Sequence, residues 1–254
     1  MTKLIHDIDK LRGRVTEYRR GGRSIGLVPT MGALHEGHLS LIRRARDEND
    51  RVVVTIFVNP TQYDDPSDLE RYPRTLASDL EKAEESGADL VFHPEAEAIY
   101  ADGYRFKVME TDFSRELEGA HRDGHFHGVL TVVLRLLNII QADRAYFGEK
   151  DWQQLRLVRD MAAAFFHPTE IIGCPTVREP DGLAMSSRNV HLTPDERALA
   201  PEFHRILASR STTQEMKRQL ANTGLAVDYV EQRGDRILGA IRLGKVRLID
   251  NVQL

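Results

Sequence analysis

Cysteine and tryptophan are nearly absent from this sequence, which contains one of each among 254 residues. The single cysteine, Cys174, cannot form a disulfide within the chain, so we expect a protein of the reducing cytoplasm. Positive charge is not in excess, because 35 Lys and Arg residues are outnumbered by 39 Asp and Glu residues, for a formal net charge of −4. Nucleic-acid binding needs a basic surface, so we expect no nucleic-acid partner.

Long apolar runs are also missing. No stretch approaches the roughly 18 residues that a membrane-spanning helix needs. The first residues, MTKLIHDIDKLRGRV, mix acids and bases where a secretory signal would have an apolar centre. We therefore expect no membrane association. The hydrophobic content of 41% is that of an ordinary globular chain, long enough for one large domain or two modest ones.

Strand-like and helix-like segments alternate from Ser24 to Val177. Strands are expected at residues 24–29, 51–58, 88–94, 143–148 and 170–177, and helices at 4–20, 39–47, 75–87, 128–141 and 152–166. Short strands are also expected near 106–109. This alternation predicts an α/β fold in which helices cover a parallel sheet through right-handed crossovers.

The pattern changes after Val177. Residues 178–196, REPDGLAMSSRNVHLTPDE, are rich in turn formers. Helices from Pro194 and near 214–222 follow, and then two strands, AVDYVEQ and KVRLID. We therefore expect a first domain over residues 1–176 and a small α+β domain over residues 177–254.

The stretch PTMGALHEGH, residues 29–38, lies where the first strand of this alternation ends and a helix begins. Ligands of open parallel sheets bind beyond the carboxyl ends of the strands, and helix N-termini attract anions. His35 and His38 are three residues apart, so at a helix start they share a face and could hydrogen-bond phosphate oxygens. A zinc helix would need H-E-x-x-H, and the dinucleotide motif G-x-G-x-x-G is absent. The alternative that both histidines only cap the helix stays open from these residues alone.

Five motifs in order give the sequence a specific resemblance to a known family. The H-x-G-H motif after T-M-G resembles the signature of the nucleotidyltransferase superfamily, and MSSRN stands where class I aminoacyl-tRNA synthetases carry K-M-S-K-S. FVNPTQY, GAHRDGHFHGVLTVVLRLLNIIQ, YFGEKDWQQL and VREPDGLAMSSRN resemble the pantothenate synthetase (pantoate–β-alanine ligase) family over residues 25–193. The likeness is weaker in VDYVE and RLGKVRLIDN.

The resemblance implies a Rossmann-like first domain and a small C-terminal lid domain. It also implies an ATP-dependent ligase that makes pantothenate, AMP and pyrophosphate from pantoate and β-alanine through a pantoyl adenylate. Mg²⁺ would accompany ATP, held mainly by phosphate oxygens and water, and no protein metal ligand is expected. A cytoplasmic homodimer is expected from the family.

The resemblance further implies which residues form the site. ATP would be bound by Met31, Gly32, Ala33, Leu34, His35, Glu36, Gly37, His38, Gly148, Glu149, Lys150, Asp151, Val177, Met185, Ser186, Ser187 and Arg188. Catalysis would depend on His35, His38, Lys150 and Arg188, with His38 the residue usually assigned as proton donor. Pantoate and β-alanine would be bound by Gln62, Gln154 and Asn59, and Arg122 and His125 are weaker candidates.

Other interpretations stay open at this stage. Asp151 could serve only as a helix N-cap, and SSRN could be a turn closed by its own side chains. The protein could instead transfer AMP to a phosphate ester, or bind ATP as a non-catalytic regulator. Because only QRGDRILGA separates VDYVE from the last motif, we expect a shortened lid that releases some AMP without β-alanine.

Overall fold

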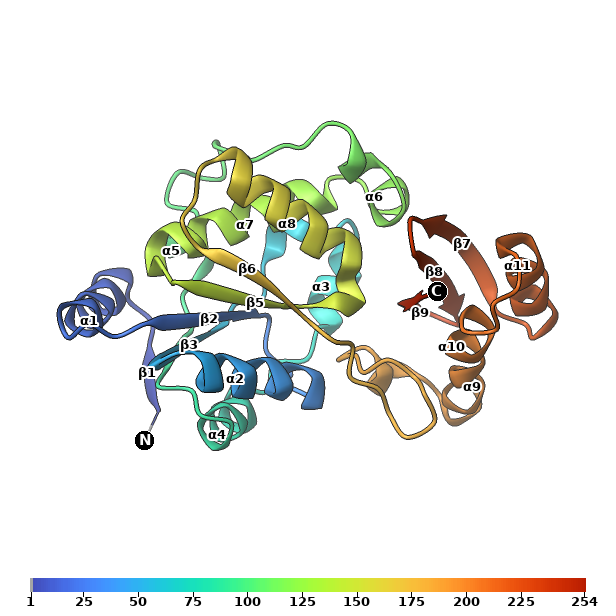
Figure 1. Ribbon diagram of the computed structural model, residues 1–254, viewed down its shortest axis with the longest axis horizontal. Helices are drawn as coiled ribbons and strands as arrows, with labels where there is room; N and C mark the ends of the chain where they lie inside the picture. The colour runs from blue at the N-terminus through green and yellow to red at the C-terminus, as the bar shows by residue number, and fades with distance from the viewer. Residues whose placement is uncertain (1) are drawn as a thin grey trace. The chain divides into compact units, whose positions relative to one another are not determined.

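The computed structural model describes residues 2–254 (Figure 1). The chain forms two compact units. The first contains the chain up to Gly148 together with Gln153–Cys174, and the second contains Glu149–Trp152 together with Pro175–Leu254. The sequence placed the division after residue 176 and did not single out residues 149–152. Among residues 2–254, no helix is long and apolar enough to span a bilayer.

A six-stranded parallel sheet forms the centre of the first unit, with the order β1-β4-β3-β2-β5-β6. Its strands are β1 (Lys3–Ile5), β2 (Ile25–Thr30), β3 (Arg51–Ile56), β4 (Leu90–Phe92), β5 (Arg144–Gly148) and β6 (Glu170–Cys174). The chain runs outward in one direction from β2 through β3 and in the other from β5 to β6. The carboxyl ends of β2 and β5 are therefore at the topological switch point, where such sheets bind ligands. The predicted parallel α/β sheet is confirmed.

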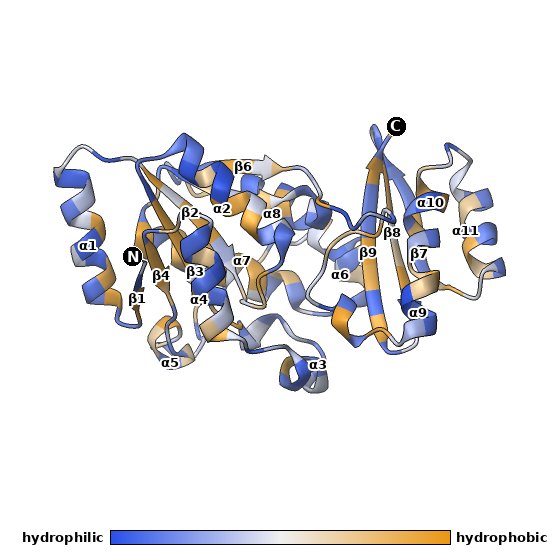
Figure 2. Cartoon of the chain, turned by 90° about the horizontal axis from the view of Figure 1, so that it is seen from below, coloured by the Kyte–Doolittle hydropathy of each residue, from blue (hydrophilic) through white to orange (hydrophobic). Residues whose placement is uncertain are grey.

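Helices cover both faces of this sheet, with α2 and α4 on one face and α7 and α8 on the other (Figure 1). The helices of the first unit are α1 (Ile8–Arg20), α2 (Glu36–Glu48), α3 (Pro66–Arg71), α4 (Leu76–Glu85), α5 (Ala96–Ile99), α6 (Glu118–His121), α7 (His125–Ile140) and α8 (Trp152–Ala164). Neighbouring residues of β2 join different cores, because Leu27 packs with α7 and Val28 with α2. This two-sided burial explains the continuous apolar strands, which Figure 2 colours as hydrophobic.

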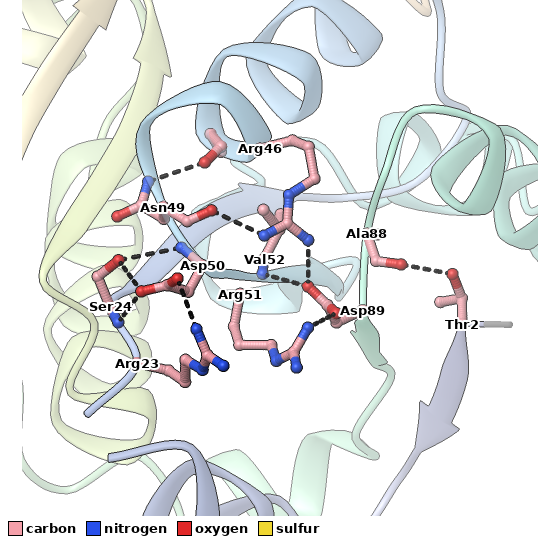
Figure 3. Close-up of polar contacts among 11 residues, drawn as sticks. Thr2, Arg23, Ser24, Arg46, Asn49, Asp50, Arg51, Val52, Ala88 and Asp89 are labelled. Atoms are coloured by element: carbon pink, nitrogen blue, oxygen red, sulfur yellow. Dashed lines mark hydrogen bonds and ion pairs between the residues drawn. The ribbon is translucent and has the colours of Figure 1, made fainter. Parts of the chain in front are cut away.

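Ion pairs and hydrogen bonds fix the amino ends of the strands (Figure 3). Asp89, just before β4, accepts from Arg46 Nη1 at 2.7 Å, from Arg51 Nη1 at 2.9 Å and from the backbone N–H of Val52 at 2.8 Å. Similarly, Asp50 accepts from the backbone N–H of Ser24 at 2.9 Å. These contacts lie at the sheet edge opposite the carboxyl ends, so we assign them to stability.

The second unit contains a three-stranded antiparallel sheet of β7 (Ala226–Arg233), β8 (Arg236–Leu243) and β9 (Val246–Gln253). Its helices are α9 (Pro194–Leu199), α10 (Pro201–Leu207) and α11 (Thr213–Asn222), and apolar residues of α10 and α11 pack on the sheet. The predicted small α+β domain is confirmed. Strand β8 was not predicted from the sequence, where its residues were taken for a connection between the two outer strands. Gly234 (φ +59°) and Gly244 (φ +58°) supply the left-handed conformation in the tight turns on either side of β8.

Two local expectations were wrong. Residues 4–20 were expected to form one helix, but β1 pairs with β4, and the helix begins only after Asp7, whose Oδ1 accepts from Lys10 N at 2.8 Å. A three-residue strand stabilised by non-local pairing leaves little periodic signal. The expected strands near 106–109 are a loop, whose N–H groups at Phe106 and Val108 donate to side chains instead of to a neighbouring strand.

Candidate active site

The loop between β2 and α2 carries both histidines of the H-x-G-H motif. The helix begins at Glu36 rather than at Leu39, which makes His35 its N-cap: His35 Nδ1 accepts from the backbone N–H of Gly37 at 3.2 Å. The N–H of His35 in turn donates to His38 Nδ1 at 3.4 Å, and the two ring centroids are 4.1 Å apart. Both imidazoles therefore lie together at the N-terminus of a helix, where the macrodipole favours an anion.

Asp79, on α4, anchors this loop from within the protein. Its side chain is 1% exposed. One carboxylate oxygen accepts from the backbone N–H of Leu34 at 2.7 Å, and the other accepts from that of Ala33 at 2.9 Å and from Thr75 Oγ1 at 3.1 Å. Gly32 has φ +82°, and a Cβ there would lie 3.0 Å from Asp79 Oδ2. The backbone of the predicted ATP loop is thus held by a carboxylate distant in sequence.

Asp79 was not predicted as part of the site, although the sequence carries a signal for it. Leu76, Leu80 and Ala83 form the apolar stripe of α4 and pack in the core. Asp79 lies on the same stripe, at helical spacing from these residues. A carboxylate on the buried face of an amphipathic helix must have hydrogen-bond partners, so it predicts a backbone segment that needs an acceptor.

Replacing Asp79 with asparagine is expected to loosen the loop. An amide offers one acceptor oxygen, so one of the two backbone N–H groups would face another donor, at a cost of about 1–3 kcal/mol in the free energy of unfolding. We expect the KM for ATP to rise while the KM for pantoate stays unchanged, in steady-state kinetics combined with thermal unfolding. The matched control is Glu81→Gln, an exposed carboxylate on the same helix. Lower stability with an unchanged KM for ATP would limit Asp79 to folding.

Gln62 lies beside the same loop, in the 3₁₀ turn η1 (Pro60–Gln62) that follows β3. Its Oε1 accepts from Asn59 Nδ2 at 2.9 Å, and its Nε2 lies 3.2 Å from Met31 Sδ. The structure therefore brings the predicted pantoate ligand Gln62 into contact with the first residue of the predicted ATP loop.

Asn59 was expected to bind pantoate and β-alanine, but it lies in the interior of the protein. Its side chain is 1% exposed. Its Oδ1 accepts from Tyr100 OH at 2.6 Å and its Nδ2 donates to Gln62 Oε1 and, at 3.2 Å, to the carbonyl of Gly128. Burial raises the pKa of Tyr100 to about 12, so its hydroxyl remains a donor. The Asn59 side chain thus makes these hydrogen bonds within the protein and orients Gln62.

Arg122 and His125 also lie next to Gln62. His125 Nδ1 donates to the Gln62 carbonyl at 2.8 Å, and His125 Nε2 accepts from Arg122 Nη1 at 3.1 Å. Gly128 of α7 lies against the same turn, since a Cβ there would be 2.3 Å from the carbonyl oxygen of Thr61. The two weaker candidates are therefore part of the Gln62 environment.

The two glutamines at the start of α8 differ in burial. Gln153 is 3% exposed and donates to the carbonyls of Phe113 and Glu116, so it supports the fold. Gln154 is half-buried. Trp152 is only partly buried.

Lys150 lies in the 3₁₀ turn η3 (Glu149–Asp151), which belongs to the second unit. Its Nζ is 3.7 Å from Asp151 Oδ2, and its side chain is 18% exposed. The backbone carbonyls of Glu149 and Lys150 accept from Asn251 Nδ2 at 2.8 and 3.0 Å. A strand of the C-terminal sheet therefore holds this turn in place.

Residues 177–188 form a closed loop in the same unit. Residues 177–185 are closed by a hydrogen bond from Met185 N to the Val177 carbonyl at 3.0 Å, and in the following turn Ser186 Oγ accepts from the N–H of Arg188 at 3.2 Å. Ser186 thus also closes a turn, which is the alternative that the sequence left open for SSRN. The catalytic candidate Arg188 and the hydroxyls of Ser186 and Ser187 follow one another on this turn.

A buried ion pair ties this loop to β9. Arg178 donates to Asp250 through both terminal nitrogens, at 2.7 and 3.0 Å, and His204 Nδ1 lies 3.2 Å from the same carboxylate. Burial acts to raise the pKa of Asp250, but the hydrogen bonds and charges of His204 and Arg178 outweigh it and lower the pKa below its ordinary value. Asp250 therefore remains a carboxylate and keeps the loop closed.

Each unit thus assembles its own part of the predicted site. The first unit contains Met31, Gly32, Ala33, Leu34, His35, Glu36, Gly37, His38, Asn59, Gln62, Gly148 and Gln154, and the second contains Glu149, Lys150, Asp151, Val177, Met185, Ser186, Ser187 and Arg188. Within residues 2–254, no group of three or more His, Cys, Asp or Glu side chains is arranged to hold a metal ion.

Comparisons with known proteins cover the whole of both units. A family model described as pantoate-beta-alanine ligase matches residues 3–253. The pantothenate synthetase of Bdellovibrio bacteriovorus is 52% identical over 236 residues, which are 93% of this chain and 94% of that protein. That of Coxiella burnetii is 46% identical over 255 residues, which are 99% of this chain and 97% of that protein.

Among solved structures, the pantoate-beta-alanine ligase of Francisella tularensis, complexed with beta-gamma ATP and beta-alanine, has a TM-score of 0.95 at 40% identity, covering 100% of this chain and 98% of that chain. The pantothenate synthetase of Thermus thermophilus has a TM-score of 0.90 at 40% identity, covering 99% of each chain.

These lengths bear on the expected shortening of the C-terminal region. This chain covers 97% of the C. burnetii protein and 98% of the F. tularensis chain, so these two relatives are of nearly the same length as this chain. The stretch that looked like a trimmed connection is β8, the central strand of a three-stranded sheet.

The match therefore extends over both units, through a family model that spans residues 3–253 and relatives that are 46–52% identical over nearly the full chain. It agrees with the order of the five motifs and with the placement of the histidine pair at the switch point of the sheet. The chain belongs to the pantoate–β-alanine ligase family.

Proposed function

We propose that this protein condenses pantoate with β-alanine, consuming ATP and forming pantothenate, AMP and pyrophosphate through a pantoyl adenylate. It is thus a ligase that forms a carbon–nitrogen bond. One observation carries the proposal: a chain that matches the ligase family over residues 3–253 has His35 and His38 together at the N-terminus of α2, in the loop whose residue Met31 contacts Gln62.

The first step makes the carboxylate reactive. Pantoate is anionic and has no good leaving group, so its carboxylate oxygen first attacks the α-phosphorus of ATP, and the bond to pyrophosphate breaks with its electron pair. Because Nδ1 of both His35 and His38 accepts a backbone N–H, each neutral ring carries its proton on Nε2, which is the donor a phosphate oxygen needs. The histidines would stabilise the charge that develops on the leaving group, with His38 as the candidate proton donor.

The second step forms the amide. The amine of β-alanine attacks the acyl carbon, the bond from that carbon to AMP breaks, and the nitrogen loses a proton. Gln62 and Gln154 would hold pantoate and then β-alanine. Asn59, through its hydrogen bond to Gln62 Oε1, would aim the Gln62 amide nitrogen at the substrate.

The second unit would supply the other half of the ATP site and act as a lid that excludes water. Lys150, Arg188, Ser186 and Ser187 would bind the triphosphate. The ribose would lie against Gly148, Glu149 and Asp151, and the adenine against the backbone of Val177 and Met185. Mg²⁺ would arrive with ATP, coordinated by phosphate oxygens and water, since the described carboxylates offer no dedicated cage. A cytoplasmic homodimer belongs to the same proposal.

Omitting one substrate at a time tests the function. We expect pantothenate only when ATP, pantoate and β-alanine are all present, and AMP release at no more than a small fraction of the full rate when β-alanine is omitted, by mass spectrometry and an AMP assay. Without β-alanine, radiolabelled pyrophosphate should exchange into ATP only if pantoate is added. Transfer of AMP to a phosphate ester, with no response to β-alanine, would favour the alternative nucleotidyltransferase instead.

A further inference from the structure

The C-terminal motif RLGKVRLIDN has no part in the chemistry above, yet its last residue reaches the segment that carries Lys150. Asn251 lies on β9 and is 4% exposed. Its Nδ2 donates to the carbonyl of Glu149 at 2.8 Å and to that of Lys150 at 3.0 Å. The two N–H bonds of one amide thus hold two consecutive carbonyls of a three-residue turn.

Arg236, on the neighbouring strand β8, fixes the orientation of that amide. Its Nη1 donates to Asn251 Oδ1 and its Nη2 to Glu149 Oε2, both at 2.7 Å. With its oxygen directed at the guanidinium, the Asn251 amide presents its nitrogen to the turn, and the reverse orientation would lose the three hydrogen bonds of the amide. Arg236, Asn251 and the turn therefore form one closed hydrogen-bond network.

The same strand also holds the second ATP segment of this unit. Asp250, next to Asn251, binds Arg178 and accepts from the N–H of Asn251 at 2.8 Å. Neighbouring residues of β9 thus tie the Lys150 turn and the 177–188 loop to one sheet. A sheet is a rigid support, and rigid placement matters because a misplacement of about 1 Å can cost roughly a hundredfold in rate.

We propose that Asn251, oriented by Arg236, is a positioning residue that sets the place of Lys150 during adenylation. The inference rests on the proposed function of Lys150. Asn251 itself contacts the backbone of the turn rather than a substrate. The effect of Asn251 on the reaction rate should therefore depend entirely on the presence of Lys150.

A double-mutant cycle between Asn251 and Lys150 tests this. The readout is exchange of radiolabelled pyrophosphate into ATP at saturating pantoate, for Asn251→Ala, Lys150→Ala and the double variant. We expect Asn251→Ala to slow exchange by about ten- to a hundredfold, the range of a misplaced catalytic group, with the KM for pantoate unchanged. In the Lys150→Ala background the same substitution should change the rate by less than about twofold, because coupled residues are not additive.

Two further variants separate positioning from folding. Asn251→Asp keeps the volume and the pairing with Arg236 but turns two donors into acceptors that face the two carbonyls, so it should slow exchange like Asn251→Ala. Both Asn251 variants are also expected to have a lower free energy of unfolding, so exchange is measured at a temperature where thermal unfolding shows that the variant is folded. Gln253→Ala is the matched control on the same strand, where only an exposed contact with Asp235 at 3.0 Å is lost, and it should leave exchange unchanged.

The outcomes distinguish the proposed function of Lys150 from its proposed positioning by Asn251. If Lys150→Ala alone leaves exchange at the wild-type rate, the proposed function of Lys150 fails. If Lys150→Ala slows exchange but both Asn251 variants exchange normally, or if Asn251→Ala slows the Lys150→Ala background by its full factor, positioning by Asn251 is overturned and the function of Lys150 stands.

Discussion

Replacing Lys150 with alanine is expected to slow formation of the pantoyl adenylate by about a hundred- to a thousandfold, the usual cost of removing one fixed donor from a charged transition state. Negative charge moves onto pyrophosphate as the α-phosphorus is attacked, and a held ammonium stabilises that charge more than it stabilises the ground state. Pre-steady-state measurement of adenylate formation at saturating ATP isolates this step.

The fold should survive this substitution, because Lys150 is not one of the apolar core residues of its unit. Its ion-pair partner Asp151, 3.7 Å away, has a side chain that is 46% exposed and stays hydrated when the ammonium is removed. Lys217→Ala is the matched control, because Lys217 is an exposed lysine on α11 of the same unit. Lys150→Arg keeps the charge in a different shape and should recover part of the rate. An adenylation rate that does not respond to Lys150→Ala would remove this residue from the mechanism.

Replacing Gly128 with alanine is expected to disable the pantoate side of the site. A Cβ at this position would lie 2.3 Å from the carbonyl oxygen of Thr61 and 2.6 Å from the backbone nitrogen of Gln62. Both are backbone atoms, so rotation of a side chain cannot relieve the clash and the η1 turn must move. Displacing Gln62 by about 1 Å should lower kcat/KM for pantoate by roughly a hundredfold. The overpacking should also cost about 1–3 kcal/mol in the free energy of unfolding.

Gly13→Ala is a control for which the expected change in stability is opposite to that of Gly128→Ala. Gly13 is exposed on α1, and a Cβ there would meet no atom within 4 Å. Alanine is favoured over glycine in a helix by about 1 kcal/mol, so this variant should be slightly more stable and kinetically normal. Unaltered pantoate kinetics in Gly128→Ala would show that the η1 turn does not position the substrate.

Much of the fold could be predicted from local pattern. The buried strands from β2 to β5 are apolar runs bounded by turn formers, and α7 carries a clear apolar stripe. The strands that were missed have weaker signals. The three residues of β1 depend on pairing with β4, 87 positions away, and β8 contains Gly239, which is not a strand former. Local sequence cannot reveal a partner at that distance.

The candidate site likewise contains residues that could be predicted from local sequence and residues that could not. The H-x-G-H motif, Gln62 and the Lys150 turn were predicted because the resemblance marks short segments. Their supports were not, because they come from elsewhere in the chain: Asp79 is 46 residues from Ala33, and Asn251 is 101 residues from Lys150. Of these supporting residues, only Asp79 has a signal in the local sequence, because it is a carboxylate on the apolar stripe of a helix. For Asn251 and Gly128, the need for the residue arises from packing that exists only in the folded chain.

The structure of the protein bound to pantoate and a non-hydrolysable ATP analogue tests most directly whether both units act on one triphosphate. We predict that its phosphate oxygens lie within hydrogen-bond distance of Nε2 of His35 or His38 in the first unit and of Lys150 and Arg188 in the second. A triphosphate bound by one of these sets alone, with the other facing solvent, would contradict the proposed mechanism.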